Sequence, residues 1–427
     1  MAGPASAVAL LGAIACSASG PQPSGAAVGA TSPSVSWPAF RFDASHSGVT
    51  PEQLLNAGNA ATLTAGWTAA AGAASDTSPA VANSAPGVVT VYVGDSSGVL
   101  HAYKAIGGAQ AWSYKVSGPT AAVLTSPTVF GGDVYFASKS GTLYAVKAAT
   151  GAFVCSFNTG KQIESSPTVV TAADGSGPVV YIGTLAGGEW AVYGAGNTHG
   201  ACSKDWFFHS FTVPPGGTWS SAAYGTNALR EHVVVFGSKD DDDSVYALDA
   251  GTGALVWRYQ TSNLSEQDVG SSPLVSAPGV NGIADGAVYV EGKDGFVYAL
   301  DLSSGSLQWK FKVSQPGLDV SSPSLAGASL LIGSSAGLYG LDAVTGALLW
   351  HALTTISVAS SPAVTGAPGS QVAFVAGLSG SLYGINVASG SVLWTGSTTT
   401  GFYASPAVSH GVVYDVDLGG TLHTYKP

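Results

Sequence analysis

The chain has 427 residues, a formal net charge of −11 and only 9% charged residues, of which 14 are Lys or Arg. So few basic side chains cannot form the patch that binds nucleic acid or an anionic membrane surface, and we exclude those partners. The scarcity of charged helix formers disfavours long exposed helices, whereas short β-branched and aromatic runs broken by glycine predict an all-β protein.

The first 16 residues are predicted to be an export segment. Residues 5–15 form an apolar run too short to span a bilayer, and the run ends in AIAC, with small residues before Cys16. This pattern resembles a lipoprotein cleavage box, so Cys16 is predicted to be lipidated and to supply the sole membrane contact. No Lys or Arg precedes Arg41, which is unusual for an export signal. We expect an extracellular, cell-surface or periplasmic protein.

A Ser-, Gly-, Pro- and Ala-rich linker is predicted over residues 17–36, and a repeat follows it. The most regular feature of the repeat is a Ser-Pro step that opens an apolar run, as in TSPAV and SSPLV. It occurs at Pro79, Pro127, Pro167, Pro273, Pro323, Pro362 and Pro406, with Ala222 in the proline position of an eighth copy. Pro79 and Pro406 are 327 residues apart over seven steps, a mean period of about 47.

Each copy contains four short strand-like runs, which we name A, B, C and D in chain order. Four strands with a period in the forties are typical of one blade of a β-propeller. A large aromatic side chain of strand D is predicted to dock between neighbouring blades. That position holds Trp67, Trp112, Cys155, Trp206, Trp257, Trp309, Trp350 and Trp394.

The two ends of the repeat predict how the ring closes. The first copy begins with a D-like run around TAGWTAA, and the last copy ends with a C-like run, TLHTYKP. The N-terminal run can therefore complete the eighth blade, which leaves no open edge in the ring. We predict an eight-bladed β-propeller over residues 37–427, and we expect a monomer.

Cys155 occupies the tryptophan position of the second blade, and Cys202 lies four residues before Trp206, where the third blade turns from C to D. Paired cysteines of exported proteins tend to become disulfides. With Cys16 assigned to the export segment, we predict a Cys155–Cys202 disulfide that replaces the missing tryptophan as the link between blades. The alternative is a buried free thiol that packs as a small hydrophobe.

A candidate binding site is predicted where the D–A and B–C loops meet, because alternating strands bring these loops to one face. The residue three before each proline position should lie at the mouth of the central channel on this face. The candidates at or near this level are Asp76, Glu164, Trp219, Asp268, Asp319 and Tyr403. An acidic mouth would favour cationic or sugar-like ligands over anions. The alternative is that these polar groups only solvate the channel.

Four consecutive acids lie in the B–C turn of the fourth blade: Asp240, Asp241, Asp242 and Asp243. Carboxylates suit a cation such as calcium, but their spacing does not match a calcium-binding loop. We therefore expect a solvated acidic loop, with a metal site as the alternative. No H-E-x-x-H or G-x-S-x-G motif occurs, and no catalytic residue is predicted.

The pattern ALDxxTGxxxW, repeated between SSP and YVG runs, resembles the PQQ-type (pyrroloquinoline-quinone-type) propeller repeat family over about residues 37–427. The stretch WPAFRFDASHSGVTPEQLLNAGNAATLTAGW is similar to the segment before the first blade of many quinoproteins. The resemblance implies one of two functions. One is the activity of a quinone-dependent dehydrogenase, and the other is a non-catalytic role like that of the outer-membrane assembly lipoprotein.

The resemblance also sets a test for the enzyme. Quinoprotein dehydrogenases carry two adjacent cysteines, calcium-binding Glu and Asn residues beside a basic Asp, and often a C-x-x-C-H haem site. Here the three cysteines are never adjacent, C-x-x-C-H is absent, and no motif places the calcium ligands. We predict no cofactor and an exported, non-catalytic binding or scaffold propeller. The alternative is a PQQ- and calcium-dependent dehydrogenase with an atypical site. The partner stays open between a protein and a small molecule or saccharide.

Overall fold

The computed structural model describes Met1 and residues 36–118, 122–209, 217–239, 242–261, 268–280, 282–316 and 321–427. The export segment with Cys16, almost all of the linker, and Asp240, Asp241 and Asp319 lie outside these residues. The 3-10 turn η1 (Ala60–Thr62) is the one helix among them. No helix in this part of the chain has the length and apolar character needed to cross a membrane.

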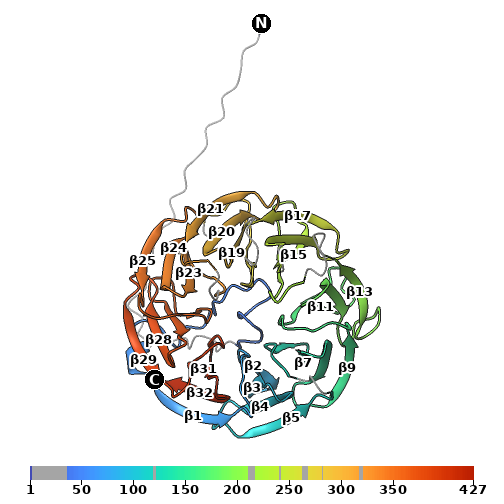
Figure 1. Cartoon of the computed structure of the whole chain (residues 1–427), viewed down its shortest axis with the longest axis horizontal. Coiled ribbons are helices and arrows are strands. Elements are labelled where there is room, and N and C mark those ends of the chain that lie inside the picture. Colours follow the sequence, from blue (N-terminus) through green and yellow to red (C-terminus); the bar gives the residue numbers. More distant parts are fainter. Residues whose placement is uncertain are drawn as a thin grey trace. The chain divides into compact units, whose positions relative to one another are not determined.

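Eight four-stranded sheets surround a central channel, which confirms the predicted all-β, eight-bladed propeller (Figure 1). Blade 1 contains β2 (Ala80–Ala85), β3 (Val88–Gly94), β4 (Val99–Lys104) and β5 (Gln110–Lys115). Blade 2 contains β6 (Thr128–Phe130), β7 (Asp133–Ser138), β8 (Thr142–Lys147) and β9 (Phe153–Asn158). Blade 3 contains β10 (Thr168–Thr171), β11 (Pro178–Thr184), β12 (Gly188–Tyr193) and β13 (Ser203–Phe208). Blade 4 contains β14 (Ala223–Thr226), β15 (His232–Gly237), β16 (Ser244–Asp249) and β17 (Leu255–Gln260).

The remaining four blades repeat the same order from the channel outwards. Blade 5 contains β18 (Leu274–Ser276), β19 (Ala287–Glu291), β20 (Phe296–Asp301) and β21 (Leu307–Lys312). Blade 6 contains β22 (Ser324–Ala326), β23 (Ser329–Ser334), β24 (Gly337–Asp342) and β25 (Leu348–Ala352). Blade 7 contains β26 (Ala363–Thr365), β27 (Val372–Ala376), β28 (Ser381–Asn386) and β29 (Val392–Ser397). Blade 8 contains β30 (Ala407–Ser409), β31 (Val412–Val416), β32 (Thr421–Lys426) and β1 (Thr64–Ala70).

The N-terminal strand closes the ring as predicted. β1 pairs antiparallel with β32, from Thr64 opposite Lys426 to Ala70 opposite Thr421. Blade 8 therefore takes its outer strand from one end of the repeat and its three inner strands from the other, and this pairing covers the edge that β32 would otherwise expose.

Seven of the eight blade junctions share one indole hydrogen bond. In each, Nε1 of the strand-D tryptophan donates to a backbone carbonyl oxygen of the next blade over 2.8–3.1 Å. The acceptor lies at the start of that blade's C–D turn, except that Trp394 donates to Leu63 beside β1. The donors are Trp67, Trp112, Trp206, Trp257, Trp309, Trp350 and Trp394. Each tryptophan therefore both packs and hydrogen-bonds across its junction.

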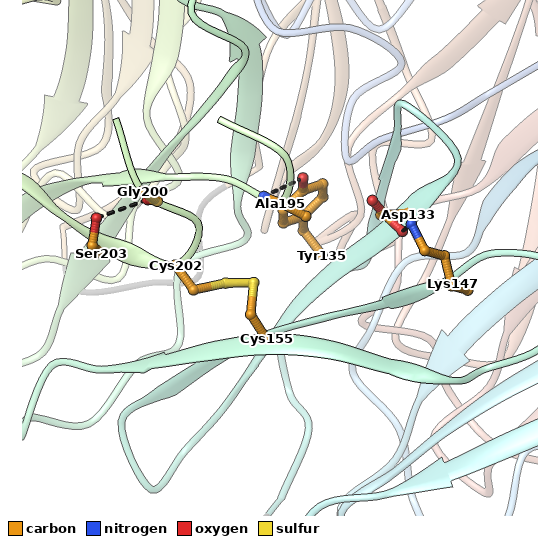
Figure 2. Close-up of a disulfide and its surroundings, with 8 residues drawn as sticks. All are labelled: Asp133, Tyr135, Lys147, Cys155, Ala195, Gly200, Cys202 and Ser203. Carbon is orange, nitrogen blue, oxygen red and sulfur yellow. Dashed lines mark hydrogen bonds and ion pairs between the residues drawn. A yellow bond between two sulfur atoms is a disulfide. The ribbon is translucent and has the colours of Figure 1, made fainter. Parts of the chain in front are cut away.

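A disulfide occupies the remaining junction, between blades 2 and 3 (Figure 2). Cys155 and Cys202 are bonded, with Cα atoms 5.9 Å apart, as predicted from the sequence. Nearby, the Tyr135 hydroxyl of blade 2 accepts a hydrogen bond from the Ala195 N–H of blade 3 at 3.0 Å. The covalent bond thus crosses the junction where a tryptophan is missing.

A closed ring of hydrogen bonds joins the inner ends of the blades. The serine before each proline position donates its N–H to the Oγ of the corresponding serine in the next blade, over 2.8–3.0 Å. The members of this serine ring are Ser78, Ser126, Ser166, Ser221, Ser272, Ser322, Ser361 and Ser405. Ser405 donates to Ser78 at 2.9 Å, so the ring closes between the last blade and the first.

Residues 37–52 follow the inner strands around the channel (Figure 1, blue). Trp37 pairs with Val81 of β2, and backbone carbonyls of residues 38–48 accept N–H groups from inner-strand residues of blades 2, 4, 5, 6 and 7. In blade 8, both oxygens of the Glu52 carboxylate accept backbone N–H groups at 2.6 Å. This segment therefore lines the channel at the level just past the proline positions.

A buried arginine anchors the same segment. The Arg41 guanidinium donates to the carbonyl oxygen of Pro362 at 2.8 Å and to Ser324 Oγ at 2.6 Å. Burial lowers the pKa of Arg41 to about 9, and the nearby Asp43 carboxylate opposes that shift. The guanidinium thus holds blades 6 and 7 to the channel segment through groups that have no competing water.

Candidate functional site

The mouth of the channel lies on the face of the D–A and B–C loops. Five of the six predicted mouth residues are described, and each precedes the inner strand of its blade. Asp76 and Tyr403 are exposed, Glu164 and Trp219 are partly buried, and Asp268 is buried. The structure brings these residues into two clusters, described next, with Tyr403 of blade 8 in neither.

The first cluster joins blades 1, 2 and 3. Lys139 Nζ, from the B–C loop of blade 2, lies 2.6 Å from Glu164 Oε1. Partial burial raises the pKa of Asp76, and the negative charge of Glu164 raises it further. Asp76 and Glu164 therefore share one electrostatic environment, with one lysine beside them.

The second cluster is centred on an indole ring. Lys293 Nζ lies 4.3 Å from the centre of the Trp219 ring, and Lys239 Nζ lies 5.7 Å from it. Lys293 also approaches Asp268 Oδ2 at 3.2 Å. Both lysines come from B–C loops, and both place an ammonium group over the Trp219 ring, where cation–π attraction is favourable.

These lysines change the expected chemistry of the mouth. The acids alone predict an acidic surface, whereas Lys139, Lys239 and Lys293 lie among the same loops. The described mouth is thus a mixed surface of paired charges around an aromatic ring. Such a surface can form charge pairs and stack against a partner, and it does not select simply for cations.

The acidic run of blade 4 is also different from the expectation. Asp242 and Asp243 are each 1% exposed, so the interpretation as a solvated loop is wrong for these two residues. Asp242 Oδ1 lies 2.6 Å from the Arg258 guanidinium, and Asp242 Oδ2 accepts the Tyr246 hydroxyl at 2.6 Å. Across the described residues there is no group of three or more His, Cys, Asp or Glu side chains placed to hold a metal ion.

Sequence reasoning missed a buried carboxyl group near the mouth. Glu189 of β12 is fully buried and lies opposite Gly183, close to Ser165 and Thr218, and burial raises its pKa well above the usual value. Neither of its oxygens has a hydrogen-bond partner among the described residues. The same position in the other blades is apolar: Leu100, Leu143, Val245, Val297, Leu338, Leu382 and Leu422.

Two further buried acids break the repeat. Glu291 ends β19 where blades 1, 3, 4 and 6 have glycine, and its Oε2 accepts the Ser321 N–H at 3.0 Å. Asp415 follows Tyr414 in β31 where other blades have apolar residues such as Val93 and Phe136. Burial raises the pKa of both groups well above the usual value. Aligning the eight copies position by position would have revealed all three acids.

Comparisons with known proteins now decide the family. The family model described as outer membrane protein assembly factor BamB, a PQQ-like repeat model, matches residues 48–192 and 338–426, which is more than half of the chain. The chain belongs to the PQQ-like propeller family. A curated relative, tetrathionate hydrolase of Acidithiobacillus ferrooxidans, is 31% identical over 155 residues, which cover 30% of this chain and 28% of that protein's length.

Solved structures share the fold of this PQQ-like propeller at low sequence identity. A europium-containing methanol dehydrogenase superposes with a TM-score of 0.74 at 15% identity, covering 92% of this chain and 98% of that one. BamB from Moraxella catarrhalis gives 0.63 at 17% identity, with 86% and 100% covered. The quinohemoprotein alcohol dehydrogenase of Comamonas testosteroni gives 0.71 at 16% identity, with 91% and 80% covered. These likenesses establish the fold and leave function to the site.

The cysteines of this PQQ-like propeller do not fit a quinone site of the dehydrogenase type. The pair that would form a ring against the cofactor is instead 47 residues apart in sequence and bonded across the junction of blades 2 and 3. We therefore assign no reaction step through such a group.

Proposed function

We propose that this PQQ-like propeller is a non-catalytic binding or scaffold module of the cell envelope, and that its mouth face holds the partner. The observation that carries the proposal is the Trp219 ring with Lys293 and Lys239 beside it on the mouth loops. Aromatic and charged side chains on rigidly held loops are the usual material of protein interfaces.

Three other features support a surface role over a deep active site. Residues 37–52 line the channel just past the proline positions and hydrogen-bond to the inner strands, so these inner-strand groups are engaged in structural contacts. The family model that matches the chain is described as an assembly factor. An envelope location agrees with that family model and with the predicted export segment at Cys16.

A photo-crosslinking experiment tests the partner face. A photoreactive amino acid at Tyr403, which is 43% exposed, should capture one discrete partner in cells that make the protein. The same group at Val344, which is 47% exposed in a C–D turn on the opposite face, should not. The Trp219→Ala substitution should abolish the crosslink at position 403. Equal capture from both faces, or capture that ignores Trp219, would refute the proposal.

The second candidate is a quinone-dependent dehydrogenase with an atypical site, favoured by the shape similarity to the two alcohol-oxidising enzymes. Purified protein is mixed with PQQ and calcium, and the cofactor absorbance and the melting temperature are measured. Under the binding-module proposal neither changes. A stoichiometric absorbance change with a raised melting temperature and alcohol-dependent dye reduction would replace that proposal with the enzyme.

A further inference from the structure

Departures from the repeat gather on one side of blade 3, on the face opposite the mouth. Tyr193 stands where blades 4, 5 and 6 have the turn aspartates Asp249, Asp301 and Asp342. Asp205 directly precedes Trp206, where the other blades have apolar residues or Gln308. Both residues line a cleft of about 420 Å³ between blades 3 and 4.

The blade 3 wall of this cleft is a bonded cluster of rings and carboxylates. The Tyr193 hydroxyl donates to Asp205 Oδ1 at 2.8 Å, and its ring lies 5.3 Å from the ring of His199. His199 Nε2 lies 2.8 Å from Asp174 Oδ2, which comes from the β10–β11 loop. The side chains are thus held in place before any ligand arrives, as a binding site requires.

The blade 4 wall is equally fixed. The side chain of Asn227 accepts N–H groups from Leu229 and Glu231 at 3.0 Å and donates to Glu231 Oε2 at 2.9 Å. This turn places Arg230, at φ +67°, beside Glu231 in the cleft lining. The rings of Tyr224 and His232 stack 5.7 Å apart along the same wall.

The lining defines the chemistry of a ligand. Four carboxylates face the cleft against one guanidinium, and three tyrosines line it: Tyr181, Tyr193 and Tyr224. Ionised carboxylates only accept hydrogen bonds, so the ligand must supply donors in several directions, and the rings offer faces for apolar carbons. The volume lies within the range of small-molecule pockets, about 300–1,000 Å³.

We propose that this cleft, which we call the tyrosine cleft, is a saccharide-binding site that works independently of the mouth. A sugar ring carries hydroxyl donors around its edge and an apolar face for a tyrosine. A compact cation would need carboxylates converging on one point, and the described residues contain no such group of three. Here the four acids are spread over both walls, and three of them take a hydrogen bond from a neighbouring tyrosine, asparagine or threonine: Asp205, Glu231 and Asp249.

The disulfide braces this site. Cys202 belongs to the C–D turn of blade 3, and its N–H donates to the Tyr193 carbonyl oxygen at 2.8 Å. The bond to Cys155 therefore fixes the turn that begins after Tyr193 and carries His199. Reduction of the disulfide should weaken saccharide binding at the tyrosine cleft without altering partner capture at the mouth.

Calorimetry and saturation-transfer NMR test the proposal with maltose, cellobiose and di-N-acetylchitobiose as sugars, and with choline and spermidine as cations. We expect at least one sugar to bind with millimolar or tighter affinity. Tyr193→Ala and Asp205→Ala should each weaken that binding at least tenfold. Gln308 occupies in blade 5 the position that Asp205 occupies in blade 3. Gln308→Ala is therefore the matched control and should leave sugar binding unchanged.

Melting curves confirm that each variant is folded, and Tyr193→Phe keeps the ring if Tyr193→Ala does not fold. Tyr193→Phe removes the hydroxyl that holds Asp205 and should weaken binding less than the alanine. The proposal is overturned if no sugar binds at millimolar concentration, if only the cations bind, or if the sugar binds equally to the Tyr193 and Asp205 variants. Crosslinking at Tyr403 is measured in parallel. Loss of partner binding at the mouth and absence of sugar binding at the tyrosine cleft are then separate results.

Discussion

Neighbouring blades are linked in two different ways at the junction of blades 2 and 3 and at the junction of blades 4 and 5. In the latter, the Trp257 indole donates to the Leu302 carbonyl oxygen at 2.9 Å, and its ring packs against Gly305 in the next C–D turn. In the former, Cys155 reaches Cys202 through a covalent bond. The two junctions differ in how strongly they constrain the length and sequence of the C–D turn in the following blade.

The tryptophan constrains that turn. A Cβ atom at Gly305 would lie 2.6 Å from the Trp257 ring, and Gly305 has φ +71°, so the turn needs a glycine there and stays short. Blade 3 has no tryptophan to pack against, and its C–D turn is longer and carries His199 and Cys202. The disulfide thus replaces the indole at the junction whose following C–D turn, that of blade 3, departs from the repeat. The tyrosine cleft lies at the next junction, between blades 3 and 4, and takes Tyr193 and Asp205 from the two strands that this turn connects.

Opening the ring tests the pairing of β1 with β32 that completes blade 8, and it should have the largest effect. Deletion of residues 60–70 removes β1 and leaves β32 as an open edge. We expect loss of soluble protein, measured as the soluble fraction after expression. Deletion of residues 2–32, which precede the first bridge to a blade at Trp37, is the control and should leave the melting transition intact. A soluble, cooperatively melting protein without residues 60–70 would contradict this reading of closure.

Removal of the disulfide compares the two junctions directly. The disulfide joins residues 47 positions apart, and closing a loop of that length contributes about 4 kcal/mol in the chain-entropy model. The double variant Cys155→Ser with Cys202→Ser should therefore lower the free energy of unfolding by about that amount. Trp257→Ala should cost a similar amount, about 3–5 kcal/mol, because it empties a buried aromatic site. Urea unfolding measures both. A double serine variant as stable as the unmodified protein would mean that the disulfide is not equivalent to the indole.

The fold could be predicted because its signals are repeated eight times. Seven of the eight copies supply a Ser-Pro step and seven supply the strand-D tryptophan, so an irregular copy such as the one with Cys155 is identified by alignment with the others. The closing strand and the disulfide followed from the same alignment of copies. The serine ring was visible as the serine before every proline position, but its hydrogen bonds required the blades to be placed around a channel.

The site was less predictable because loop side chains do not repeat. Lys139 and Lys293 reach the mouth through loop conformations that the strand pattern does not determine. Asp242 lies within a run of acids that looks solvated, yet Arg258 of β17 covers it. The channel segment around Arg41 has no repeat period, so its path could not be read from spacing.

Blade 3 also differs from the other blades in its interior, where Glu189 is a buried acid. The pKa of Glu189 is raised in the folded protein, so its contribution to stability is complete below the ordinary carboxyl pKa and is lost as pH rises through the raised one. Above the ordinary value, stability should fall by up to about 1.4 kcal/mol for each pH unit. Glu189→Leu, which restores the residue type of the other blades, should remove this part of the pH dependence.

Urea unfolding at pH 4 and pH 7 measures this difference. Glu189→Gln is the control for shape, because it keeps the side-chain length and removes the ionisation. Both variants should flatten the change between the two pH values, and the leucine should be the more stable of the two because it leaves no buried polar atom unpaired. An unchanged pH dependence in both variants would show that folding does not raise the pKa of Glu189, and Glu291 and Asp415 would then be the groups to replace.

The serine ring should give the smallest effect and tests whether the blades are equivalent at the channel. Ser272→Ala removes the Oγ that accepts the Ser221 N–H at 2.9 Å, while the Ser272 N–H keeps its bond to Ser322. We expect a loss of about 1 kcal/mol, the usual net value of one such hydrogen bond. Ser166→Ala removes the corresponding acceptor at the disulfide-linked junction of blades 2 and 3 and should cost the same, because Ser126 donates to it over a similar 3.0 Å. A clearly larger loss at Ser166 would mean that the junction without a tryptophan relies more on the ring than the other junctions do.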